Sequence, residues 1–135
     1  MPTSDTAADE PRYKRVLRGL LAAAMIAVGI AHFAAPEPFV AIVPPWLPAP
    51  LALVLVSGFF EIALGLGLLH PRTRSLAGWG LVALYVAVFP ANIHMAINGV
   101  SPGPDPLPAW VLWGRLPLQP VFMLWAYAVS RPATR

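Results

Sequence analysis

Residues 51–69 read LALVLVSGFFEIALGLGLL, a run whose single ionisable side chain is Glu61. At the rise of an α-helix this run is about 28 Å long, close to the thickness of the hydrocarbon core of a bilayer. Pro50 precedes it, and His70-Pro71-Arg72-Thr73-Arg74 follows as a short, proline-marked turn. The run therefore predicts a helix that crosses a membrane and then turns back.

Three further apolar stretches of similar length predict three more helices, at residues 15–34, 75–97 and 109–129. Of the 135 residues, 58% are hydrophobic and 11% charged, whereas a soluble domain carries about 25% charged residues. The sequence thus predicts an all-α membrane protein, a bundle of four transmembrane helices that forms one domain over residues 15–130. We expect residues 1–14 to form a disordered cytoplasmic tail and residues 131–135 to form a short cytoplasmic tail.

Prolines modify this pattern in two places. Residues 36–50 contain six prolines, which exclude a regular helix there, and their apolar neighbours should hold the segment at the membrane interface. Pro90 should bend the third helix, while Pro117 and Pro120 should make the outer half of the fourth irregular. The first apolar stretch follows a basic flank, so a cleaved signal peptide is the alternative to a first span. Its length favours a retained helix.

The basic residues that flank the predicted helices all lie on one side of the membrane. They are Arg12, Lys14, Arg15 and Arg18 before the first helix, Arg72 and Arg74 in the middle turn, and Arg131 and Arg135 after the fourth helix. The two loops between them contain no lysine or arginine. Because short basic loops stay in the cytoplasm, both chain termini should be cytoplasmic.

Two compositional facts exclude some classes of function. The chain has no cysteine, which excludes disulfides, Cys-ligated zinc and iron–sulfur clusters. The pI near 10 does not indicate nucleic-acid binding, because the basic residues form no basic face with interleaved aromatics. No nucleophile lies with a base in the pattern of a hydrolase or transferase, so the sequence does not decide whether the chain is an enzyme.

Six polar side chains lie inside the predicted helices toward their outer ends: His32, Glu61, Asn92, His94, Arg115 and Gln119. Polar groups in a bilayer are costly unless they are paired or functional. We expect them to form a polar pocket in the outer half of the bundle, bounded by all four helices and roofed by the proline-rich segment.

Glu61 and Arg115 are the expected centre of this pocket. Glu61 shares a helix face with Gly58 and Gly65, which can approach a neighbouring helix closely. Glu61 is either a structural carboxylate paired with Arg115 or an acid that exchanges protons or contacts a ligand. Arg115 and Gln119, one turn apart, suit a carboxylate or a quinone-like carbonyl. Alternatively, Arg115 extends outward and Gln119 satisfies a carbonyl that Pro120 exposes.

His32 and His94 raise the question of a metal or haem. Two histidines without cysteine or a second carboxylate make a thin ligand set, so we expect neither metal nor haem. Asn92 and His94 are two residues apart and cannot both point inward unless Pro90 distorts the helix.

Six short fragments occur in one order along the chain: residues 29–33 (GIAHF), 36–46, 57–61 (SGFFE), 70–74 (HPRTR), 90–96 (PANIHMA) and 115–119 (RLPLQ). Together they resemble the DoxX-like family of small bacterial membrane proteins. The resemblance implies a compact four-helix, multi-pass fold in the bacterial inner membrane. It also implies a link to quinone-dependent oxidation of sulfur compounds or to oxidative-stress complexes, because some relatives have that link.

The leading interpretation is a small redox-associated membrane subunit that binds a quinone or another amphipathic small molecule in the outer-half pocket. The alternatives are a non-catalytic assembly or scaffold subunit and, third, a small proton-coupled transporter. The expected partners are the lipid bilayer and either a membrane or redox protein or a second copy of the chain, with no nucleic acid.

The charge distribution generates a topology prediction. A reporter fused after Arg135 should be active only in the cytoplasm, and one inserted near Gly103 only outside, because the flanking basic residues all lie on the cytoplasmic side. Periplasmic activity from the C-terminal fusion would overturn the four-helix assignment.

Overall fold

The computed structural model describes residues 10–132, and this part of the chain is helical without any strand. Its helices are α1 (Arg12–Ala34), α2 (Glu37–Ala41), α3 (Pro50–Leu69), α4 (Arg74–Asn98) and α5 (Ala109–Ser130). Three of them, α1, α3 and α4, are long and apolar enough to cross a membrane. This finding indicates a membrane protein. The fourth predicted span, α5, is not among the three, and it remains a prediction.

The bounds of the four long helices lie within three residues of the predicted ones, and local signals explain several ends. Pro50 begins α3 in the first turn, where its missing N–H is not needed. Gly99 ends α4 in the left-handed conformation, with a φ of 62°. The N–H groups of Gly99 and Val100 both donate to the carbonyl of Met95, as is typical of a glycine C-cap.

Two of the proline predictions are corrected by the structure. Residues 37–41 form the short helix α2 inside the proline-rich segment, because Pro36 and Pro38 occupy its first turn, where proline is tolerated. The outer half of α5 is a continuous helix through Pro117 and Pro120. Proline keeps a helical φ and removes only one hydrogen bond, which neighbouring groups in a bundle can replace.

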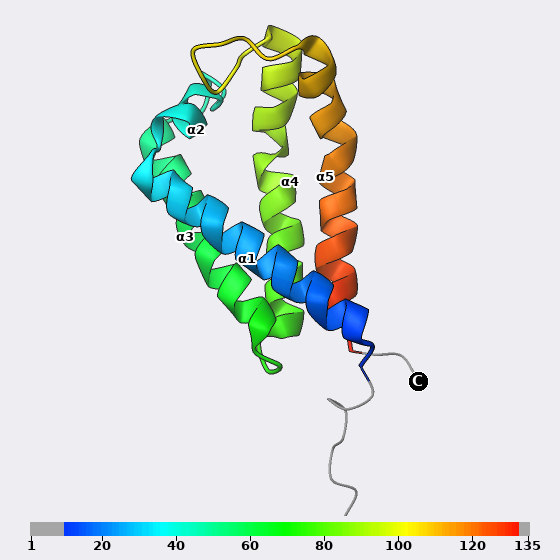
Figure 1. Ribbon diagram of the computed structural model, residues 1–135. Helices are drawn as coiled ribbons and strands as arrows, with labels where there is room; N and C mark the ends of the chain where they lie inside the picture. The colour runs from blue at the N-terminus through cyan, green and yellow to red at the C-terminus, as the bar shows by residue number, and fades with distance from the viewer. Residues whose placement is uncertain (1–9, 133–135) are drawn as a thin grey trace, which may run out of the picture.

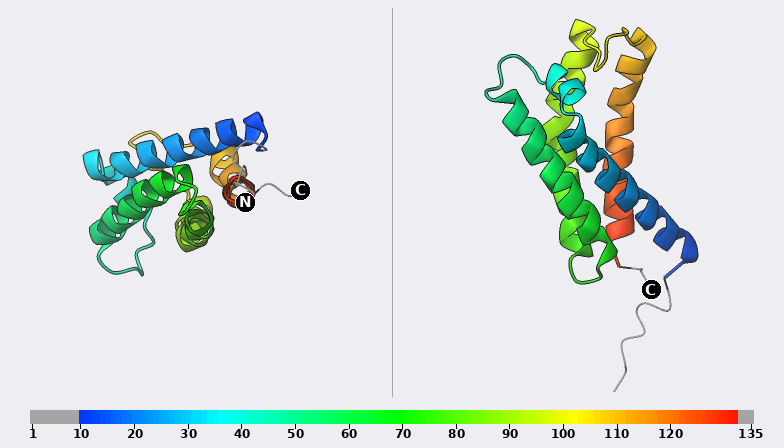
Figure 2. Two further views of the ribbon diagram at one scale, coloured as in Figure 1. Left: turned by 90° about the horizontal axis from the view of Figure 1, so that it is seen from below. Right: turned by 60° about the vertical axis from the view of Figure 1, so that its left-hand side comes forward.

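The long helices form two pairs, α1 with α3 and α4 with α5. Figure 1 shows α4 and α5 running side by side, while α1 lies obliquely on α3 and reaches α5 only near its own beginning. The two further views in Figure 2 show the same arrangement. The pairs therefore meet at the end where α1 begins and diverge toward the end where α2 lies.

The α1–α3 pair is held by a very close approach of the two backbones. A Cβ atom on Gly29 would lie 2.8 Å from the carbonyl oxygen of Gly58, and one on Gly58 would lie 3.0 Å from that of Gly29. Two turns further along α3, a Cβ atom on Gly65 would lie 3.1 Å from the carbonyl oxygen of Ala22. Small residues that allow such contact are typical of helix interfaces in membranes. The glycine face predicted around Glu61 is thus the face that contacts α1.

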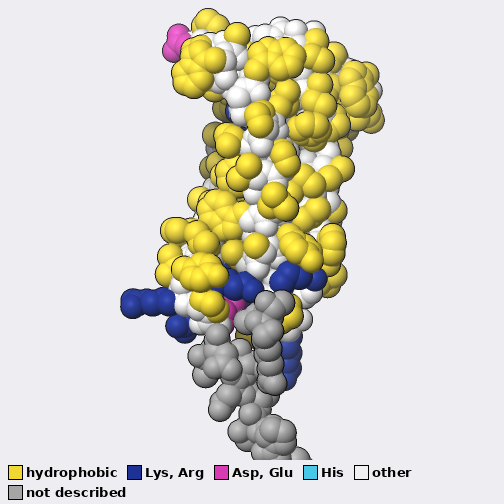
Figure 3. Space-filling model, turned by 90° about the vertical axis from the view of Figure 1, so that its right-hand side faces the viewer, with side chains coloured by type: hydrophobic (Ala, Val, Ile, Leu, Met, Phe, Trp, Pro, Cys, Tyr) yellow, Lys and Arg dark blue, Asp and Glu magenta, His cyan; other side chains and the backbone are white. Residues whose placement is uncertain are grey.

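The opposite end of the bundle is tied together by basic side chains that donate to backbone carbonyls. Carbonyls in the last turn of a helix lack helical partners, and cations near them are favourable. Bonds of this kind join Arg18 to Val129 (2.8 Å), Lys14 to Arg131 (2.5 Å) and Arg74 to Leu68 (3.1 Å). Arg131 also donates to the carbonyl of Ser75 in the first turn of α4 (2.8 Å). Figure 3 shows the lysine and arginine side chains gathered at this end, below a hydrophobic surface.

Glu10 adds a carboxylate to this basic cluster. It forms an ion pair with the buried Arg18. The hydrogen bond from Arg18 holds the pKa of Glu10 below its usual value. The segment before α1, which was expected to be part of the disordered tail, is therefore ordered from Glu10 onward, and residues 1–9 lie outside the described part.

The glycine contact generates a stability prediction. Gly58→Ala should lower the free energy of unfolding by about 1–3 kcal/mol, as overpacking typically does, because the new methyl group meets the Cβ atom of His32 at 2.6 Å and the Gly29 carbonyl at 3.0 Å. Thermal unfolding in a mild detergent measures the change. The control is Gly114→Ala in α5, where a Cβ atom meets nothing within 4 Å; it should leave stability unchanged or raise it by up to about 1 kcal/mol. Equal effects of the two substitutions would contradict the close crossing.

Candidate functional site

A cavity of about 970 Å³ lies between the two diverging helix pairs. It is lined by residues of α1, α3, α4 and α5, with Phe39 of α2 and with residues 42–44 and 47 of the proline-rich segment. Its walls are mainly apolar, and part of it is open. A concave, mostly apolar space with a few polar groups is typical of small-molecule sites, whose volumes are about 300–1,000 Å³.

Five of the six predicted site residues line this cavity: His32, Glu61, Asn92, Arg115 and Gln119. The sixth, His94, is not among the lining residues. It lies near the end of α4, where its ring is 2.9 Å from the amide nitrogen of Asn98. The expectation that Asn92 and His94 cannot both point inward is confirmed, since Asn92 lines the cavity and His94 does not. The cavity also extends further along the bundle than predicted, down to Leu21 and Leu76.

Glu61 and His32 form the polar part of the α1–α3 wall. Both side chains are largely buried, and Nδ1 of His32 lies 3.3 Å from Oε2 of Glu61. The same Nδ1 lies 2.7 Å from the carbonyl oxygen of Val28, which can only accept, so Nδ1 carries a proton that it donates to Val28. Oε2 of Glu61 consequently has no hydrogen-bond partner among the described residues.

The structural alternative for Glu61, an ion pair with Arg115, is wrong. Among residues 10–132 the carboxylates within 4 Å of a basic or imidazole nitrogen are Glu10, beside Arg18, and Glu61, beside His32, so Arg115 has no carboxylate partner there. The reason is the arrangement of the helices: α3 carries Glu61 on the face that contacts α1, and α5 lies on the other side of the cavity. Glu61 therefore lies on the α1–α3 wall of the cavity, and Arg115 lies on the opposite, α4–α5 wall.

Asn92 and Gln119 form a hydrogen-bonded chain on the α4–α5 wall. Nδ2 of Asn92 donates to Oε1 of Gln119 (2.8 Å), and Nε2 of Gln119 donates to the carbonyl oxygen of Tyr85 (2.9 Å). Gln119 thus satisfies a carbonyl of α4, one residue before the carbonyl that Pro90 leaves without its helical donor. It does not bond the carbonyl that Pro120 exposes on its own helix, which was the alternative from the sequence.

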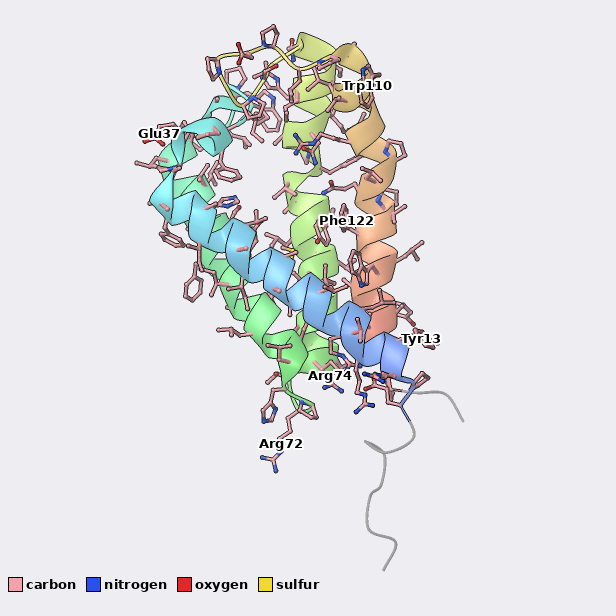
Figure 4. All side chains as sticks on the ribbon, in the orientation of Figure 1. Tyr13, Glu37, Arg72, Arg74, Trp110 and Phe122 are labelled. Atoms are coloured by element: carbon pink, nitrogen blue, oxygen red, sulfur yellow. The ribbon has the colours of Figure 1, made fainter. Side chains whose placement is uncertain are left out.

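Aromatic rings line much of the remaining surface. The ring of Phe39 stacks on that of His32, with centroids 3.8 Å apart. Phe122 stacks between Tyr85 and Trp125, with centroids at 6.0 and 5.9 Å, and Figure 4 shows it on the side of α5 that faces α4. Sequence reasoning missed Tyr85 and Trp125 as site residues. The signal for Tyr85 was its place in the middle of a predicted span, where interfacial tyrosines do not lie.

No group of three or more His, Asp or Glu side chains in the described part of the chain could hold a metal ion. His32 and His94, which sequence reasoning weighed as ligands, do not share the cavity. The expected absence of metal and haem stays a prediction.

Residues 21–130 match the family described as a domain of unknown function, DUF8561. The chain belongs to this family. No curated protein and no solved structure matches the chain. The match spans the four long helices of the chain apart from the beginning of α1, so the cavity lies within the family domain. The resemblance to the DoxX-like family stays a proposal.

The Asn92–Gln119 contact generates a prediction about the stability of the α4–α5 pair. Asn92→Leu and Gln119→Leu should each destabilise the protein, Gln119→Leu more strongly, because it also removes the hydrogen bond from Gln119 to the Tyr85 carbonyl. The double variant should cost less than the sum, with a coupling near the average of about 0.6 kcal/mol for hydrogen bonds in membranes. A double-mutant cycle of thermal unfolding measures this coupling, and additive costs would show that the two side chains do not interact.

Proposed function

We propose that the chain is a multi-pass protein of the bacterial inner membrane that binds an amphipathic small molecule with a quinone-like head group in this cavity. It acts as a small redox-associated subunit. The observation that supports this proposal is a mainly apolar cavity with the buried carboxylate of Glu61 on one wall and the guanidinium of Arg115 on the other. The resemblance to the DoxX-like family supports the redox association.

The proposal includes four membrane spans with both termini in the cytoplasm. Its support is the pairing of α5 with α4 along the bundle (Figure 1) and the gathering of the basic side chains at one end (Figure 3). In this orientation the cavity lies between helix pairs that diverge toward the outer half of the membrane (Figure 1). The polar groups that line it there would meet the head of a molecule whose apolar part enters from the bilayer.

The apolar walls set the chemical class of the ligand. A flat ring suits the aromatic lining formed by Phe39, Tyr85 and Phe122, because offset stacking favours ring against ring. The guanidinium of Arg115 presents several donors in one plane, which suits a carbonyl oxygen. A head group of this kind with an apolar tail is a quinone-like molecule.

The decisive experiment is purification of the full chain in a mild detergent, followed by mass spectrometry of the extracted small molecules. A quinone-like molecule should be recovered at close to one per chain. In Ala87→Phe, a bulky side chain enters the cavity from α4, and recovery should fall at least about tenfold, since binding that loses 1.4 kcal/mol weakens tenfold.

The matched control is the neighbouring Val86→Phe, because Val86 is exposed and does not line the cavity. This variant should retain the ligand, and both variants should unfold at similar temperatures. Recovery of a stoichiometric protein in place of a small molecule would favour the scaffold class. Equal ligand recovery from Ala87→Phe and Val86→Phe would show that the molecule is not held in this cavity.

A further inference from the structure

The two polar walls of the cavity differ in hydrogen-bonding character. On the α1–α3 wall, Oε2 of Glu61 is an acceptor without a partner among the described residues, and Glu61 is 8% exposed. The neighbouring Nδ1 of His32 donates to the Val28 carbonyl and leaves Oε2 of Glu61 unpaired. This wall therefore carries a buried carboxylate acceptor without a partner.

The α4–α5 wall offers open donors. Each side-chain amide of Asn92 and Gln119 uses one of its two N–H groups in the hydrogen-bonded chain that ends at the Tyr85 carbonyl. The second N–H group of each amide remains a donor. Arg115 is half-buried, has no ion-pair partner among residues 10–132 and can only donate. A head group that satisfies both walls must accept from Arg115 and donate to Glu61.

An oxidised quinone meets only half of this requirement. One of its carbonyl oxygens accepts from Arg115, but the molecule has no donor, so its other carbonyl oxygen beside the Glu61 carboxylate places two acceptors together. The reduced form carries two hydroxyl groups. One hydroxyl donates to Glu61 while the oxygen of the other accepts from Arg115, so each buried group gains a partner.

The net charge of the site also favours an uncharged head. The charged groups that line the cavity are one carboxylate, Glu61, and one guanidinium, Arg115. An anionic head such as a phosphate would leave an excess charge beside apolar walls, which is costly. A neutral dihydroxy ring leaves the balance unchanged and fits the aromatic lining.

We propose that the cavity is selective for the reduced, dihydroxy form of a quinone-like molecule, with Glu61 as the group that recognises its hydroxyl. The inference rests on the proposed function and adds to it the redox state of the ligand. Selectivity arises because the oxidised form leaves the buried carboxylate of Glu61 without a donor. The two forms have similar shapes, so this unpaired acceptor is what distinguishes their affinities.

The test compares decylubiquinone with its two-electron reduced form, both added without oxygen to the full chain in detergent. Binding is followed by quenching of tryptophan fluorescence, because Trp125 lines the cavity. The reduced form should bind at least roughly tenfold more tightly, as a hydrogen bond to a charged group allows. The midpoint potential of the bound couple should rise by about 30 mV for each tenfold preference, because stabilising the reduced form makes reduction easier.

Variants separate recognition from folding. Glu61→Gln should abolish the preference and strengthen binding of the oxidised form, because a carboxamide can donate to a carbonyl as well as accept from a hydroxyl. A merely misfolded variant would lose both forms. Arg115→Met should weaken the binding of both forms alike.

The matched controls change one carboxylate and one guanidinium outside the cavity. They are Glu37→Gln, at an exposed carboxylate that points away from the bundle, and Arg72→Met, in the exposed turn (Figure 4). Both variants should bind the two forms as the unmodified chain does.

Each remaining outcome is decisive. Equal affinity for the two forms, with binding still dependent on Arg115, would overturn the selectivity and leave the proposed function standing. A preference that survives Glu61→Gln would also overturn it, since recognition would then lie elsewhere. Failure of both forms to bind the unmodified chain would overturn the selectivity and the proposed function together.

Discussion

The backbone contact between Gly29 and Gly58 is the constraint on which the rest of the structure depends. It brings α1 so close to α3 that His32, one turn after Gly29, lies beside Glu61, one turn after Gly58. With any larger residue at this crossing the helices would separate and the carboxylate would lose its contact with His32. The same contact fixes the oblique path of α1, which keeps it away from the outer part of α5. The packing of one helix pair therefore creates one wall of the cavity and sets its polar group.

The cavity exists because the helices of the two pairs contact each other at one end and diverge toward the other. At the basic end, cationic side chains from α1, α4 and the residue after α5 bond carbonyls of other segments, and the buried Arg18 reaches both Glu10 and Val129. The bonds to Leu68 and Val129 satisfy carbonyls that the C-terminal ends of α3 and α5 would otherwise leave open. At the other end, Ile42 of the proline-rich segment packs against Met95, Ala96 and Leu112, while residues 99–108 connect α4 to α5. An apolar space can remain there because lipid tails and the cavity walls have similar polarity.

Sequence reasoning predicted the elements well and their partners poorly, and the reason is physical. Helix bounds follow from local signals such as apolar length, Pro50 and Gly99, which the chain carries in order. Which helix lies beside Glu61 depends on how four helices pack, and small residues on α1 and α3 decided this in favour of His32. Arg115 was the attractive partner on charge alone, but charge does not specify which helix is adjacent. The Asn92–Gln119 contact could not be predicted for the same reason, although the sequence showed both residues as intramembrane polar groups.

The separation of Glu61 from Arg115 is what makes the cavity chemically specific. Had the two groups formed a direct ion pair, each would have satisfied the other, the helix pairs would have been drawn together, and the remaining surface would have been almost wholly apolar. On opposite walls, they present an acceptor and a donor to the same space. Burial without a hydrogen-bond partner raises the free energy of each group. This penalty is removed when a bound molecule donates to Glu61 and accepts from Arg115. The arrangement that looked like structural glue in the sequence is therefore better suited to recognition in the fold.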